Sequence, residues 1–299
     1  MRTSPFCLPS EIERETGFSK EQLRKWRQRF DFPPKESNLD GKPGFSVKTV
    51  EQLLLIKRLM EAGFRPAQVV SKTVLELEKL KSELGLNIQL AMPDESTHKF
   101  IEYIKLANVK EFIALLKKKR RTQTMLTFVQ NTITPLMISI GDAWTRDEID
   151  IHHEHLCTAY IERYLQAEIL NFQPKKGLPV ILFALPPGEH HLLGLLMAEA
   201  VLAENGAVTI NIGSDIPLNN LKLAAISCKV DVVALSFSFA HPARDVLPTL
   251  LHFRRLLPPN IQIWAGGAGI STIRKRPKGV SLIYDFKDAI FALNELPQH

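Results

Sequence analysis

The sequence has few residues that could form covalent or metal cross-links, and it has no long hydrophobic run. Its 299 residues include three cysteines, Cys7, Cys157 and Cys228. Their wide spacing matches no metal-binding pattern, so we expect reduced thiols. No segment reaches the roughly 18 uninterrupted apolar residues of a membrane span, and the first residues lack the apolar run of a signal peptide. These absences predict a cytoplasmic protein without a membrane partner.

What the chain does have is enough apolar sequence for packed cores, together with an excess of positive charge. Hydrophobic residues make up 45% of it, and a chain of this length suits about two or three domains. The 38 lysines and arginines exceed the 32 aspartates and glutamates, which gives a formal net charge of +6. This charge permits binding to a polyanion but does not require it.

The N-terminal region has the pattern of a helix-turn-helix. Residues 9–16 predict a short helix that ends at a glycine, and Ser19 is the predicted N-cap of a second helix over residues 20–30. A short helix, a tight turn and a basic second helix make up this motif. The polar residues 36–45 contain glycine and proline and predict a small wing, and residues 47–62 predict a further helix.

The second helix carries cations that suit DNA. Basic side chains on it can reach phosphates, and an arginine can read the edge of a guanine. The simpler interpretation is a basic helical module that binds another protein. The predicted DNA-binding residues are Lys20, Arg24, Lys25, Trp26, Arg27, Arg29 and Lys42.

Two strings in this region resemble the winged-helix DNA-binding domain of MerR-type regulators. They are Leu-Arg-Lys-Trp-Arg-Gln-Arg-Phe at residues 23–30 and Ile-Lys-Arg-Leu-Met-Glu-Ala-Gly-Phe at residues 56–64. The resemblance departs at the wing, where the family's Gly-Tyr-Arg is Gly-Phe-Ser at residues 44–46. The wing arginine that contacts phosphate is therefore missing, and Lys42 or Lys48 is its expected substitute.

The middle of the chain has a helical pattern almost throughout. Helices joined by short loops suggest an up-down four-helix bundle. A basic run at residues 117–121 is interpreted as a solvated helix end rather than a second DNA contact. The predicted helices are residues 95–106, 109–119, 122–140 and 147–170, with breaks at Asn108 and at Gly141 and Asp142.

A tryptophan and a Glu-His pair lie near the junction of the last two of these helices. Trp144 is expected in the loop between them, and Asp147 is expected to cap the last helix. On that helix Ile151, Glu154 and His155 share one face by their three- and four-residue spacing. A flat aromatic ring beside such a pair could cover one face of a planar ligand. The simpler interpretation is a half-exposed polar helix face.

After a predicted linker at residues 174–177, strands and helices alternate. Continuous apolar runs are typical of buried parallel strands, and their alternation with helices predicts a Rossmann-like sheet. The predicted strands are residues 179–184, 207–212, 230–236, 261–265 and 282–284. The predicted helices are residues 192–205, 218–227 and 243–257.

The loop after the first of these strands carries residues that suit a metal. Residues 185–194 read Leu-Pro-Pro-Gly-Glu-His-His-Leu-Leu-Gly and lie where open α/β folds hold ligands. His191 can ligate a transition metal such as cobalt, and Glu189 can accept its other N–H. Gly194 lacks a Cβ and allows a close approach. The simpler interpretation is a loop with solvated polar residues.

This loop resembles the D-x-H-x-x-G signature of cobalamin-binding domains, with Glu189 in place of Asp. In that family the histidine replaces the nucleotide base as the lower ligand of cobalt, and the nucleotide tail enters a deep pocket. Ser236 and Ser238 resemble the family's S-x-L, and Gly266 and Gly267 resemble its G-G. The resemblance implies that all of these contact the cofactor and that bare backbone at the glycines leaves room for the tail.

Trp144 with Glu154 and His155 resembles the W-x9-E-H motif of cobalamin-binding photoreceptor regulators of the CarH and LitR type. There the tryptophan lies against the upper, adenosyl side of the cofactor, and the glutamate binds the adenosyl ribose. In the light-responsive members a histidine follows the tryptophan and can ligate cobalt once the adenosyl group has left. Thr145 stands at that position here, which leaves the ligand of the light-exposed state unassigned.

Together the resemblances imply a winged-helix DNA-binding domain over residues 1–76, a four-helix bundle over residues 77–174 and a Rossmann-like cobalamin-binding domain over residues 175–299. They imply a transcriptional repressor and not an enzyme. It would bind operator DNA and adenosylcobalamin, respond to light through photolysis of the cobalt–carbon bond, and form a cofactor-dependent homodimer or tetramer. The alternatives are a cobalamin sensor that ignores light, a corrinoid carrier in methyl transfer or isomerisation, and a regulator that needs no vitamin.

Overall fold

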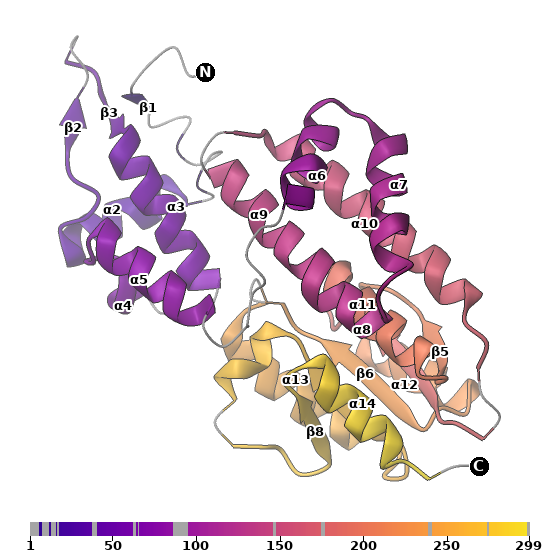
Figure 1. Ribbon diagram of the computed structural model, residues 1–299. Helices are drawn as coiled ribbons and strands as arrows, with labels where there is room; N and C mark the ends of the chain where they lie inside the picture. The colour runs from indigo at the N-terminus through magenta and orange to yellow at the C-terminus, as the bar shows by residue number, and fades with distance from the viewer. Residues whose placement is uncertain are drawn as a thin grey trace. The chain divides into compact units, whose positions relative to one another are not determined.

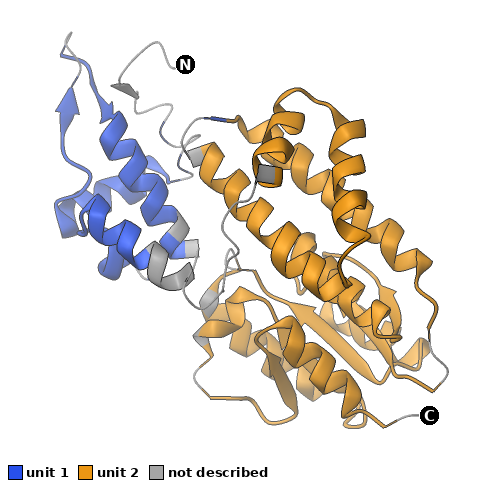
Figure 2. Cartoon of the chain, in the orientation of Figure 1, with its two compact units in different colours: residues 1–90, 145–148 blue, residues 91–144, 149–299 orange. Residues whose placement is uncertain are grey.

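The computed structural model divides the chain into two compact units (Figure 2). The first comprises residues 1–90 and 145–148, and the second comprises residues 91–144 and 149–299. None of the described helices is long and apolar enough to cross a membrane. The structure describes residues 6–7, 12, 16, 18–37, 41–61, 64, 66–85, 95–145, 148–174, 177–238, 241–273 and 275–297.

The first unit packs helices against a small antiparallel sheet (Figure 1). Ser19 begins helix α2 by accepting a hydrogen bond from the Gln22 N–H at 3.2 Å, as the sequence predicts. The central strand β3 pairs with β1 and with β2, so the predicted wing is a two-stranded hairpin. The elements are β1 (Phe6–Cys7), α2 (Lys20–Phe30), β2 (Glu36–Ser37), β3 (Pro43–Ser46), α3 (Val47–Glu61), α4 (Pro66–Val69) and α5 (Val74–Gly85).

The first predicted helix, over residues 9–16, falls mainly outside the described residues. Ile12 and Thr16 are described, and both are buried. The Thr16 hydroxyl donates to the Ile12 carbonyl at 2.7 Å, a bond between residues one helical turn apart.

The N-terminal part of the second unit is helical, as predicted. The helix predicted over residues 122–140 is a continuous rod that contains the π-helical turn η1 and extends to Thr145. The elements are α6 (Glu95–Lys105), α7 (Val109–Arg120), α8 (Met125–Phe128), η1 (Val129–Ile133), α9 (Thr134–Thr145) and α10 (Ile151–Asn171).

Helix α9 runs through Gly141 and Asp142, so the predicted break there is wrong. A glycine inside a helix costs only about 1 kcal/mol relative to alanine, and burial of the neighbouring Ile140 and Ala143 offsets that cost. Trp144 consequently lies in the last turn of α9 and not in a loop.

Helix α10 begins later than predicted. Its N-cap is Asp150, whose backbone N–H donates to Nδ1 of His153 at 3.0 Å. This reciprocal cap satisfies a backbone donor at the helix start. Asp147, the predicted cap, lies outside the described residues.

The C-terminal part of the second unit is a five-stranded parallel sheet of order β5-β4-β6-β7-β8, and it confirms the predicted Rossmann-like fold (Figure 1). After β5 the chain crosses back over β4 to form β6, so the strand order reverses between β4 and β6. Open α/β sheets hold ligands outside the carboxyl ends of strands at such a switch point. The strands are β4 (Val180–Ala184), β5 (Val208–Asn211), β6 (Val232–Ser236), β7 (Gln262–Gly266) and β8 (Val280–Ile283).

Helices cover both faces of this sheet. Apolar residues of α11 and α14 pack with one face, and those of α12 and α13 pack with the other. Helix α14 and the 3-10 turn η2 were not predicted from the sequence. The elements are α11 (Leu192–Glu204), α12 (Leu218–Ser227), α13 (Ala243–Leu256), η2 (Ala268–Thr272) and α14 (Phe286–Asn294).

Helix α11 packs against the helices α6 to α10 on one side and against the sheet on the other. Its Leu196, Ala200 and Val201 belong to the same core as the buried residues of α6 to α10, while its Leu195 and Leu202 pack in the core on the sheet. Movement of the helices over α11 would therefore disturb packing beside the sheet, because protein interiors are close-packed.

Arg120, at the end of α7, forms ion pairs with α10 and α11. Its Nη2 lies 2.7 Å from Oε1 of Glu204 on α11, and its Nε lies 3.2 Å from Oε2 of Glu168 on α10. The second Glu204 oxygen accepts the Met125 N–H at 2.6 Å. The basic run at residues 117–121 is therefore not wholly a solvated helix end.

We expect Arg120→Ala to lower the free energy of unfolding of the second unit by about 2 kcal/mol, because it removes the cation that faces two partly buried carboxylates. Urea unfolding followed by circular dichroism measures this. Lys118→Ala, an exposed neighbour on the same helix, is the control and should change the midpoint little. Equal midpoints for the two variants would contradict the expected role.

Candidate functional site

The loop between β4 and α11 holds a buried carboxylate beside an exposed imidazole. Glu189 is 1% exposed, and its Oε1 lies 2.7 Å from Nδ1 of His191. The same oxygen accepts the backbone N–H groups of His190 and His191, each at 2.9 Å. We assign the Nδ1 proton to the bond with Glu189, which places the lone pair of the neutral ring on Nε2. The His191 side chain is 63% exposed.

The second Glu189 oxygen joins this loop to the loop after β6. Its Oε2 accepts the Ser238 N–H at 2.8 Å, and the Ser238 hydroxyl lies 3.1 Å from Nδ1 of His191. The structure thus brings together Glu189, His191 and Ser238 at the switch point of the sheet. Such a carboxylate–imidazole pair fixes the tautomer and direction of a histidine that binds a metal.

Glu189 is ionised at neutral pH. Burial alone would raise the pKa of its carboxyl, but the hydrogen bonds from His191 and Ser238 outweigh burial and lower the pKa to about 2. A buried negative charge of this kind makes the neighbouring imidazole a better ligand for a cation.

The predicted glycines have a structural role that differs from the one expected. A Cβ on Gly267, whose φ is +84°, would lie 2.4 Å from the Phe237 carbonyl oxygen, and a Cβ on Gly269 would lie 2.7 Å from that of Ser238. The bare backbone at Gly267 is therefore filled by the β6 loop and not left open for a ligand. A Cβ on Gly194 would lie 3.7 Å from the Ser236 hydroxyl, which is ordinary contact.

Gly266 ends β7 beside Ser236 of β6, whereas the residues predicted for the upper side of the cofactor lie on α9 and α10. A Cβ on Gly266 would meet the Ile283 carbonyl at 3.4 Å. Trp144 is partly buried against the helical core, and Ile151 is exposed. Glu154 Oε2 lies 3.3 Å from Nδ1 of His155, so these two predicted residues form a pair at the first turn of α10.

Asp150, His152 and His153 also gather at the start of α10, with ligand atoms within 4.8 Å of one another. However, Nδ1 of His153 accepts the Asp150 N–H, so the ring proton of a neutral His153 lies on Nε2. His153 then has no free lone pair for a metal. This cluster works as a helix cap in the described conformation.

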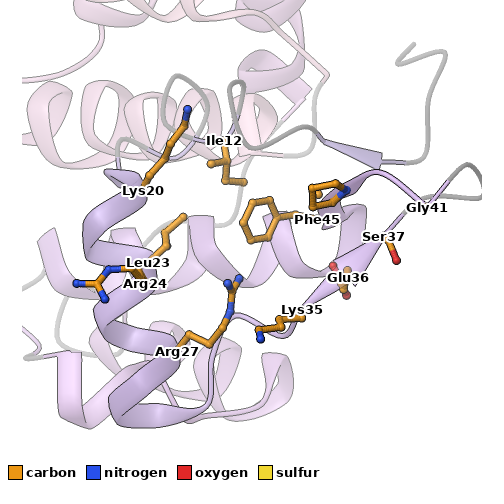
Figure 3. A pocket seen from close by; sticks show the side chains of 12 residues that line it. Ile12, Lys20, Leu23, Arg24, Arg27, Lys35, Glu36, Ser37, Gly41 and Phe45 are labelled. Carbon is orange, nitrogen blue, oxygen red and sulfur yellow. The ribbon is translucent and has the colours of Figure 1, made fainter.

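In the first unit, a hollow of about 500 Å³ separates α2 from the wing hairpin. In Figure 3 Arg27 and Lys35 lie between α2 and the wing, and Leu23 and Phe45 point into the same space, whereas Arg24 points away from it. Its shape and charge suit a polyanion such as the DNA backbone. The basic lining residues are Lys20, Arg24, Arg27 and Lys35.

The cations predicted to bind DNA are not equivalent. Arg24 donates Nε and Nη2 to the two Glu21 oxygens at 2.8 and 2.7 Å, and Lys25 Nζ lies 3.7 Å from Glu21. Arg27 donates Nε to the Pro33 carbonyl at 2.7 Å, so part of its guanidinium supports the turn after α2.

Trp26 differs from the prediction. It is 5% exposed and packs edge to face against Phe18, with ring centroids 4.7 Å apart. It is a core residue of the first unit and not a DNA contact, because the apolar face of an amphipathic helix turns inward. Arg29 lies over the Phe30 ring at 5.3 Å, and Lys42 is exposed on the wing.

Comparison with known proteins finds a different family match in each of the two units. Residues 9–72 match the family described as MerR HTH family regulatory protein, and residues 98–167 match the B12 binding domain. The HTH-type transcriptional repressor CarA of Myxococcus xanthus is 25% identical over 260 residues, which cover 86% of this chain and 85% of that protein. CarH, a second HTH-type transcriptional repressor of that organism, is 23% identical over 256 residues, with 84% and 85% covered.

The chain is similar in sequence to the CarA and CarH repressors over most of its length.

It combines a MerR-type helix-turn-helix with a B12 binding domain, and the match to the latter falls on helices α6 to α10. Among solved structures, the monomethylamine corrinoid protein of Methanosarcina barkeri aligns with a TM-score of 0.47 and 17% identity, over 66% of this chain and 97% of that one. A cobalamin-binding protein from Desulfitobacterium hafniense aligns with a TM-score of 0.31 and 11% identity, over 66% and 97%.

One residue of the site was missed from the sequence. His241 is 5% exposed and its Nδ1 lies 3.9 Å from Oε2 of Glu189. It follows the S-x-S segment in the loop after β6. A histidine in such a loop carries no pattern that separates a buried position from a solvated one.

Acid should remove the contribution of Glu189 to stability. Its folded pKa lies below the ordinary value of 4.5, so this contribution is present above pH 4.5 and is lost as pH falls towards about 2. The shift corresponds to about 3 kcal/mol. We expect the difference in unfolding free energy between wild type and Glu189→Gln to shrink over this range in urea titrations. Exposed Glu102→Gln is the control, and parallel curves for wild type and Glu189→Gln would contradict the assignment.

The hollow between α2 and the wing should contribute to binding of any duplex. We expect Lys20→Ala to weaken binding to a random-sequence duplex and to reduce the slope of log affinity against log salt by about one, since one phosphate contact is lost. Fluorescence anisotropy at several salt concentrations measures the slope. Exposed Lys287→Ala in the second unit is the control, and an unchanged slope for Lys20→Ala would place the DNA elsewhere.

Proposed function

We propose that the chain is a cytoplasmic transcriptional repressor that binds operator DNA through its first unit and adenosylcobalamin through its second, with His191 as the lower ligand of cobalt. One observation carries the proposal. An ionised, buried Glu189 holds the exposed His191 imidazole by Nδ1 at the switch point of a parallel sheet. The similarity to two HTH-type transcriptional repressors and the MerR match of residues 9–72 support the regulatory role.

The residues of the second unit fit a corrinoid. The site offers one protein ligand, an imidazole that a carboxylate orients. A single ligand of this kind suits the cobalt of a corrinoid, whereas a structural metal site surrounds its ion with several protein ligands. Ser236, Ser238, Gly194 and the neighbouring Gly266 would line the lower side. When bound, adenosylcobalamin supplies a cobalt–carbon bond that light can cleave.

The upper side would be covered from the helices. We assign this side to Trp144 on α9 and to residues on the first turn of α10, namely Ile151, Glu154 and His155. Exposed Ile151 and the Glu154–His155 pair offer an apolar contact and hydrogen bonds to an adenosyl group. We propose that α6, α7, the α8–α9 rod and α10 act as a four-helix bundle in this role.

The signal would pass through α11. This helix begins directly after His191 and shares a core with α8 to α10. Different contacts to the upper face in two cofactor states would bias the helices between two positions. We propose that these positions favour different oligomeric states, a dimer or a tetramer against a monomer, and so different affinities for an operator.

A cobalamin sensor that ignores light is the second candidate. Thr145 follows Trp144 where light-responsive members have histidine, and Nδ1 of His153 is occupied by the helix cap. Both observations favour a protein that reports the presence of the cofactor over one that seals a light-exposed state. A corrinoid carrier is disfavoured by the N-terminal DNA-binding domain.

An absorption spectrum of the full chain mixed with adenosylcobalamin tests the proposal. We expect a base-off spectrum with a histidine ligand for wild type, and about a tenfold or greater loss of affinity for His191→Ala, since the metal ligand is removed. His190→Ala is the matched control because His190 is equally exposed and pairs with Asp215 at 3.6 Å. Equal spectra for the two variants would refute His191 as the ligand.

Light separates the two candidates. The photoreceptor predicts a change in elution volume on size-exclusion chromatography after green illumination of the loaded protein. An elution volume that changes on cofactor addition but not on illumination would support the sensor that ignores light. No change under either condition would contradict the oligomeric switch.

A further inference from the structure

His241 is a buried histidine with polar atoms that the site described above does not use. Neither ring nitrogen has a hydrogen-bond partner among the described residues. Its ring packs edge to face on Phe237, with centroids 5.2 Å apart, and its backbone N–H donates to the Ser238 carbonyl at 3.3 Å. The ring is thus held in place by packing, and not by hydrogen bonds of its own.

Glu189 is the charged partner beside the His241 ring, and both the backbone and the side chain of Ser238 also hydrogen-bond to Glu189. Its Oε1 has three donors from His190 and His191 at 2.7 to 2.9 Å, whereas its Oε2 has the Ser238 N–H at 2.8 Å. A carboxylate oxygen can accept more than one hydrogen bond. Nδ1 of His241 lies 3.9 Å from Oε2.

One water with two hydrogen bonds at a tetrahedral angle would join atoms about 4.6 Å apart, so the shorter separation favours a direct contact. A buried polar group without a partner is unfavourable, so the direct contact is the one that satisfies His241. A side-chain shift of about 1 Å brings Nδ1 to hydrogen-bond distance.

We propose that His241 is a positioning residue, which donates Nδ1–H to Glu189 Oε2 and fixes the carboxylate plane that aims His191. The terminal torsion of glutamate is broad, so the donors around Glu189 set its plane. Ser238 and His241 would hold Oε2, and the other oxygen would then face Nδ1 of His191. The role of that imidazole as a cobalt ligand rests on the proposed function; the positioning of the imidazole does not.

Three substitutions in the full chain separate the donor from the shape of the ring. His241→Asn keeps a donor at the place of Nδ1, His241→Gln moves it to the place of Nε2, and His241→Phe keeps a ring without a donor. Thermal melts of the apoproteins show whether each variant folds. If the Phe variant does not fold, the Asn and Gln pair carries the comparison.

Two readouts are taken. In the apoprotein, long-range proton–nitrogen spectra report the tautomer of His191, expected as Nδ1–H in wild type and the Asn variant and mixed in the Gln and Phe variants. With cob(II)alamin, electron paramagnetic resonance shows nitrogen splitting from a histidine ligand. We expect the Gln and Phe variants to lose about tenfold in cobalamin affinity and to show a smaller split fraction, whereas the Asn variant matches wild type.

The outcomes distinguish the two proposals. A wild-type tautomer and a wild-type split fraction in folded Gln and Phe variants would overturn the positioning role and leave the cofactor site intact. A wild type that binds no cobalamin, with tautomers that still differ between variants, would refute the proposed function while supporting the positioning role. Loss in the Asn variant equal to that in the Phe variant would show that the ring, not the donor, matters.

Discussion

The second unit is organised around one buried negative charge. An isolated carboxylate inside a protein is strongly unfavourable unless hydrogen bonds compensate it, and Glu189 obtains that compensation from two loops. The first is its own loop after β4, and the second is the loop after β6, through Ser238. The hydrogen bonds to this carboxylate therefore link the loops after β4 and β6, on either side of the switch point. An imidazole that is hydrogen-bonded to the carboxylate is held at the same place.

The close approach of a third loop follows from the same arrangement. The β6 loop that donates Ser238 N–H to Glu189 also receives the backbone of Gly267 and Gly269, and the Gly269 N–H donates to the Phe237 carbonyl at 2.8 Å. A side chain at either glycine would collide with this loop. The two glycines thus affect the site indirectly. They allow the segment after β7 to pack closely against the loop that hydrogen-bonds to Glu189.

Much of this could be predicted from the sequence, because the decisive residues are close together in it. Glu189 and His191 lie two residues apart after an apolar strand, and that spacing allows few arrangements. The inward turn of Trp26 was missed although Leu23 and Trp26 share the apolar face of α2. The role of His241 could not be predicted, because its carboxylate partner Glu189 lies on a loop far away in sequence. The predicted break at Gly141 failed for a related reason, since tertiary packing on both sides overrides a local helix preference.

In the function proposed above, the path of the signal depends on the elements that carry the two sets of site residues. His191 is the residue before α11, and the Glu154–His155 pair lies on α10, which packs along α11 in the shared core. A ligand held by both sets would fix the start of α11 against the start of α10. Arg120 already fixes the opposite end of α11, through Glu204, to α7 and α10. Because ion pairs within the protein hold the Glu204 end of α11, the end that follows His191 is the one whose position would depend on the ligand. Loss of the contacts between α10 and the ligand would then let the helices pivot about the fixed end and not slide along one another.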